Sequence, residues 1–65
     1  MPDLIQDLMR EIHRVEQLYP SFEGEALESV KRRVAYAQHG LAMNATRVMK
    51  ESLLDLQDII EKPKP

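Results

Sequence analysis

Proline and glycine divide this chain of 65 residues into three uninterrupted stretches, and this division limits the fold more than any other feature. The four prolines stand at positions 2, 20, 63 and 65, and the two glycines are Gly24 and Gly40. Leu, Ala, Glu, Lys, Arg, Gln and Met, which all favour helix, fill the stretches between them. The sequence therefore predicts an all-α protein with helices near residues 4–19, 22–39 and 44–61, connected so that neighbours run antiparallel.

The first stretch has the spacing of an amphipathic helix. Asp3 can accept hydrogen bonds from the free amides of the first turn. The apolar positions then recur three or four residues apart, at Ile5, Leu8, Ile12, Val15 and Tyr19. The polar positions are expected to face solvent and to form pairs of Asp7 with Arg10 and of Glu11 with Arg14. Pro20 should end this helix, and Ser21 is a candidate cap for the next.

His39-Gly40 leaves two architectures open. A left-handed glycine at Gly40 would end the second helix there, with Asn44 as the cap of a third helix, and this gives an up-down-up three-helix unit. A helix that continues through Gly40 would instead give a hairpin with a long second arm, because a glycine inside a helix costs only about 1 kcal/mol. We expect the break at Gly40. A continuous helix should be stabilised by Gly40→Ala, and a left-handed cap destabilised.

The small size of the chain points to association. A domain of this length buries only about 60% of the surface that its unfolded chain exposes, and the absence of cysteine leaves no disulfide to reinforce it. We expect one small helical domain over residues 1–62, a disordered tail at 63–65, and a homodimer or a complex with a larger protein that covers the surplus apolar residues. The candidate interface residues are Leu4, Leu8, Met9, Val48, Met49, Leu53, Leu56, Ile59 and Ile60.

A net charge of -2 gives no general attraction to phosphate or anionic lipid. Lys31, Arg32 and Arg33 form the densest basic cluster and are the candidate contact if the chain meets nucleic acid. Consecutive residues fan around a helix, however, and no aromatic residues alternate with these three. Nor does any stretch approach the roughly 18 apolar residues of a membrane span. We therefore expect a cytoplasmic protein without nucleic-acid or membrane partners.

No arrangement of residues predicts catalysis, a cofactor or a metal. His13 and Glu16 share a helix face, but bundle metal sites use the order Glu-x-x-His and need it on two helices. No glycine-rich phosphate loop is present, and the serines have no recognisable partners for nucleophilic chemistry. Met9, Met43 and Met49 lie on or near apolar faces, where thioethers fill cores or form adaptable docking surfaces.

The segment Glu11 to Ile60 resembles the C-terminal helical lid of DnaK-type heat-shock chaperones. The matching pieces are the helix from Glu11 to Tyr19, the turn at Pro20, the run Leu27-Glu28-Ser29-Val30-Lys31, a loop at Gly40, and the ending from Leu53 to Ile60. The family loop is polar, whereas Leu41-Ala42-Met43 is apolar here. The resemblance implies a packing or docking module without an activity of its own.

The sequence thus favours a non-enzymatic helical protein-protein interaction module, either a self-associating bundle or a small adaptor. The alternative is a small nucleic-acid-associated regulator that uses Lys31, Arg32 and Arg33. Binding that weakens steeply with salt would distinguish the regulator from the module.

Overall fold

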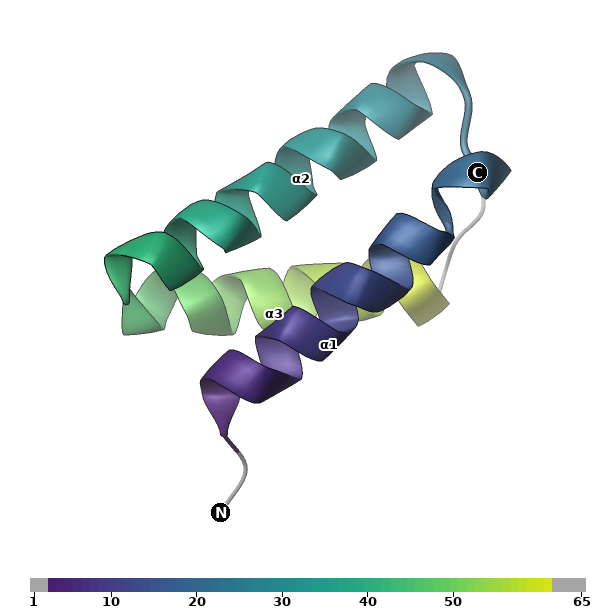
Figure 1. Cartoon of the computed structure of the whole chain (residues 1–65). Helices are drawn as coiled ribbons and strands as arrows, with labels where there is room; N and C mark the ends of the chain where they lie inside the picture. The colour runs from purple at the N-terminus through teal and green to yellow at the C-terminus, as the bar shows by residue number, and fades with distance from the viewer. Residues whose placement is uncertain (1–2, 62–65) are drawn as a thin grey trace.

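The computed structural model describes residues 3–61, and these fold into three α-helices; the second runs back along the first, and the third reverses direction again and crosses the other two at an angle (Figure 1). Helix α1 spans Leu4–Gln17, α2 spans Gly24–Met43 and α3 spans Thr46–Glu61, and a short 3-10 helix, η1, spans Tyr19–Ser21. The all-α, three-helix prediction is confirmed. The tail expected at 63–65 lies outside the described residues, and so do residues 1, 2 and 62 of the expected domain.

The first corner follows the sequence signals closely. The Asp3 carboxylate accepts a hydrogen bond from the Ile5 amide at 3.0 Å and caps α1 as predicted. Pro20 lies in η1, which turns the chain after α1 has ended. Ser21 does not cap α2, because it belongs to η1 and the extended Glu23 precedes the helix without a side-chain cap.

The predicted break at Gly40 is wrong, because α2 continues through this residue to Met43. Gly40 is buried where α3 packs against α2. A Cβ atom built there would lie 2.7 Å from Cγ1 of Val48 and 3.6 Å from Cγ of Met49, both in α3. Glycine is therefore needed for the close approach of two helices, and the loop that the chaperone-lid resemblance placed at Gly40 is helical.

Asn44 ends α2 in place of Gly40. Its φ of 53° and ψ of 40° are left-handed, a conformation that Asn adopts more readily than most residues. The Ala45 amide donates to the Gly40 carbonyl at 3.0 Å, and the Asn44 amide donates to the Leu41 carbonyl at 3.2 Å. This is the Schellman pattern of a helix end. Asn44 thus ends one helix and does not cap the next, and a three-helix unit forms although Gly40 is helical.

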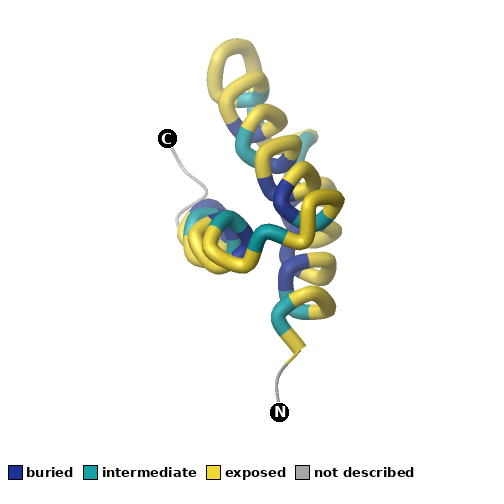
Figure 2. Tube along the Cα trace, turned by 90° about the vertical axis from the view of Figure 1, so that its left-hand side faces the viewer, coloured by how far each residue is buried: buried dark blue, intermediate teal, exposed yellow. Residues whose placement is uncertain are grey.

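Helix α3 makes the main contacts that hold the fold together. It packs extensively against both α1 and α2, which touch each other far less. Figure 2 views α3 almost end-on beside the other two helices, with the buried residues of all three facing inward. The shared core contains Leu8, Ile12, Val15, Val30, Val34, Ala37, Met49, Leu56 and Ile59.

Candidate interaction surface

Four of the nine candidate interface residues are not on the surface. Leu8, Met49, Leu56 and Ile59 are buried in the core of the single chain. Their assignment to an interface is corrected, because α3 uses its apolar face against α1 and α2 and leaves none of these four for another protein. Of the other five, Met9 is exposed, and four are half-buried: Leu4, Val48, Leu53 and Ile60.

Five large apolar side chains remain exposed after the core is complete: Ile5, Met9, Tyr36, Met43 and Leu54. Ile5 and Met9 lie four residues apart on α1 and therefore share one face of that helix. Tyr36 and Met43 lie seven residues apart on α2 and share a face in the same way. These five are named here the outer apolar residues.

Of these five residues, only Met9 is among the interface residues that the sequence predicts. The exposure of Leu54 could have been predicted, because it is two positions from Leu56 and therefore lies about 200° around the helix from it. Tyr36 carried a similar signal, since it precedes the buried Ala37 and follows Val34 by two positions. The methionines divide in the same way, with Met9 and Met43 outside and Met49 in the core. Thioether side chains at a surface adapt readily to a partner.

The basic cluster does not form one patch. Arg33 reaches α3, where its Nε lies 2.9 Å from Oδ2 of Asp55 and 3.1 Å from Oδ1, and its Nη2 also binds Oδ1. The hydrogen bond with Asp55 raises the pKa of Arg33. Lys31 lies over the ring of Tyr19, with Nζ 5.9 Å from the ring centre. One of the three candidate cations is thus part of the α2–α3 contact and a second packs beside η1.

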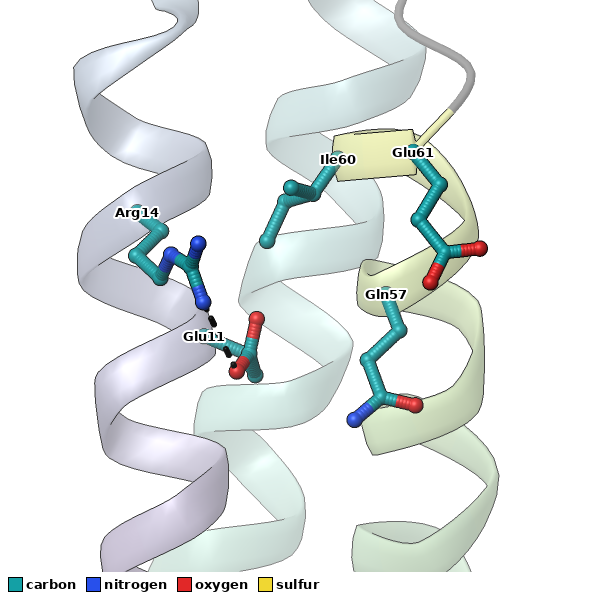
Figure 3. A pocket seen from close by; sticks show the side chains of 5 residues that line it. All are labelled: Glu11, Arg14, Gln57, Ile60 and Glu61. Carbon is teal, nitrogen blue, oxygen red and sulfur yellow. Dashed lines mark ion pairs between the residues drawn. The ribbon is translucent and has the colours of Figure 1, made fainter.

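A polar hollow of about 240 Å³ opens between α1 and α3. Figure 3 shows Glu11 and Arg14 on α1 facing Gln57, Ile60 and Glu61 on α3. Glu11 is buried, although the sequence placed it on the solvent side, because α3 covers that flank of α1. The expected pairs do form, with Arg10 3.4 Å from Asp7 and Arg14 3.6 Å from Glu11.

The histidine considered above as a metal ligand has a polar neighbour on its own helix. Nε2 of His13 lies 3.1 Å from the side-chain nitrogen of Gln17, so this histidine is engaged on an exposed face of α1. Over residues 3–61 no three His, Asp or Glu side chains gather as metal ligands would. None of the helices in that range has the length and apolar character to cross a membrane.

The comparisons with known proteins supply no relative. No family model matches the chain, and neither the curated proteins nor the solved structures contain a match to it.

Proposed function

We propose that this chain is a non-enzymatic helical interaction module that associates with a second copy of itself through the outer apolar residues. The observation that carries the proposal is that Ile5, Met9, Tyr36, Met43 and Leu54 are between 43% and 69% exposed, although the same three helices already bury a separate set of apolar residues as their core. An apolar side chain gains free energy when a partner removes it from water, by roughly 25 cal/mol for each Å² buried.

Size supports the same proposal. A domain of 65 residues has a small core, and such domains commonly gain stability from oligomerisation. Because the chain has no cysteine, disulfide bonds cannot stabilise it. Association between two copies would bury further apolar surface, and the outer apolar residues are already exposed on the helices for this contact.

The resemblance to the chaperone lid and the cytoplasmic location stay predictions within this proposal. A lid-like module would dock on a larger protein and would use the same exposed side chains. The two versions differ in the partner, and they are separated by the mass of the purified chain in solution.

Polar substitution of the exposed methionines tests the proposal. Met9→Gln combined with Met43→Gln keeps the length of both side chains and their helix propensity, so the fold should remain intact. Light scattering should then give a dimer for the parent chain and a monomer for this variant. Arg10→Gln combined with Ala42→Gln is the matched control, since it changes exposed neighbours on the same two helices and should stay dimeric. Equal masses for the parent and the methionine variant would exclude these side chains from the contact.

A further inference from the structure

The methionines of the described residues occupy two different environments. Met9 on α1 and Met43 at the end of α2 are 56% and 64% exposed, whereas Met49 on α3 is 2% exposed and belongs to the core. The fourth methionine, Met1, lies outside the described residues. A peroxide oxidises a thioether when it can reach the sulfur atom through solvent. Met9 and Met43 are therefore open to oxidation, and Met49 is shielded from it.

The chain has no cysteine, so no thiol competes with these thioethers for peroxide. In the reaction, a lone pair of the methionine Sδ attacks one oxygen of hydrogen peroxide. The O–O bond breaks, an S–O bond forms, and the second oxygen leaves as water with both hydrogens. The sulfur is oxidised by two electrons and the peroxide is reduced by two. The product is methionine sulfoxide, whose oxygen makes a formerly apolar side chain polar.

The neighbours of the two exposed sulfurs give this change a consequence. Ile5 lies one helical turn before Met9 and Tyr36 lies two turns before Met43, and both neighbours belong to the outer apolar residues. A partner that covers these side chains would also have to remove the sulfoxide oxygen from water. Burial of such an acceptor without a donor is unfavourable. Oxidation should therefore oppose burial of the outer apolar residues, while the core remains unchanged.

We propose that Met9 and Met43 form a reversible redox switch, in which hydrogen peroxide converts both to sulfoxides and separates the dimer into folded monomers. This inference rests on the proposed self-association and adds its regulation. The dimer covers the same two side chains, so oxidation proceeds on the monomer, and association protects them. Reductases that draw electrons from a dithiol return each sulfoxide epimer to methionine, and this resets the switch.

Peptide mass spectrometry of the full chain after exposure to hydrogen peroxide tests the oxidation sites. At a concentration where the chain is monomeric, Met9 and Met43 should gain oxygen about tenfold or more faster than Met49, which reacts only when the core opens. At concentrations where the dimer forms, oxidation of Met9 and Met43 should become slower, and that of Met49 should not. Equal rates at all three positions in the monomer, or no protection in the dimer, would overturn the switch.

Light scattering of the oxidised chain tests the effect on association. Oxidation of both residues should raise the dimer dissociation constant by about tenfold or more and leave the helical circular dichroism unchanged. Treatment with the two epimer-specific reductases and dithiothreitol should restore the dimer. Met9→Leu combined with Met43→Leu is the matched control, because it keeps the apolar volume and should dimerise with or without peroxide.

Two outcomes would overturn the switch while self-association stands: dissociation of the leucine variant by peroxide, or a parent chain that stays dimeric with both sulfoxides formed. A parent chain that is monomeric before peroxide is added would overturn the self-association, and the switch with it. In that case the faster oxidation of Met9 and Met43 than of Met49 would still establish the two oxidation sites.

Discussion

The inner and outer faces of α3 each carry a leucine, and the two leucines differ completely in their exposure to solvent. Leu56 is 0% exposed and faces α1 and α2, whereas Leu54, two positions earlier, is 69% exposed. Two positions along an α-helix correspond to a rotation of about 200°, so Leu54 and Leu56 lie on opposite faces of α3. The number of apolar residues in a helix therefore does not tell how many belong to the core. The position of each residue around the helix decides whether it is buried in the core or exposed on the surface.

The same division holds across the molecule. The inner residues contribute to folding whether or not a partner is present, and the outer apolar residues contribute when something covers them. Substitutions on the two faces should therefore have separate effects, on stability for one and on association for the other.

Replacing the two leucines by alanine should give the largest contrast. Leu56→Ala leaves a cavity at a fully buried site and should lower the free energy of unfolding by about 2–5 kcal/mol. Leu54→Ala removes an exposed side chain and should change it by about 0.5 kcal/mol or less in the monomer. Urea unfolding at a concentration where the chain is monomeric measures both. Similar losses for the two variants would show that the faces are not distinct.

Gly40→Ala should come next in size, and with the sign opposite to that expected for an ordinary helical glycine. Alanine gains about 1 kcal/mol of helix propensity, but its Cβ would crowd the β-branched Val48, and overpacking of this kind costs about 1–3 kcal/mol. We expect the cost to exceed the gain, with a net loss of up to about 2 kcal/mol.

Val48→Ala provides the control for this steric explanation. With the Val48 methyl groups removed, the added Cβ has room, so Gly40→Ala should cost less in that background than in the parent. An equal cost in both backgrounds, measured by a double-mutant cycle, would mean that crowding against α3 is not the cause.

Ser52→Ala should have the smallest effect on the inner face and should stabilise the protein. Ser52 is buried in α3, and its hydroxyl has no hydrogen-bond partner among the described residues. Its removal should raise the midpoint of thermal unfolding and contribute about 1 kcal/mol. Ser29→Ala on the exposed side of α2 is the control for helix propensity and should gain less. A loss of stability in Ser52→Ala would show that the hydroxyl is hydrogen-bonded in the folded protein and would contradict this prediction.

Local signals explain which parts of the fold were predictable. Asp3 and Pro20 act on residues next to them in the chain, and both the cap and the first corner follow from the sequence. Local signals could not decide whether Gly40 or Asn44 ends α2, because both residue types adopt left-handed conformations readily. What decided between them was the packing of Val48 against Gly40, a contact between helices that no local pattern encodes.

The candidate site was predictable only in part for a related reason. Periodicity identifies the apolar face of each helix but not how much of that face its neighbours cover. Leu8, Met49, Leu56 and Ile59 belong to faces that proved fully covered. Glu11 became buried because α3 lies against the flank of α1 that carries it, and this depends on how the helices pack.

The mass of the chain as a function of its concentration tests the central claim most directly. Sedimentation equilibrium over the micromolar range should give an average mass that rises from 7.5 kDa toward twice that value, with a melting temperature that rises in parallel. The variant with Met9→Gln and Met43→Gln should stay at the monomer mass and melt independently of concentration. A parent chain that remains a single 7.5 kDa species with a concentration-independent melting temperature would contradict self-association through the outer apolar residues.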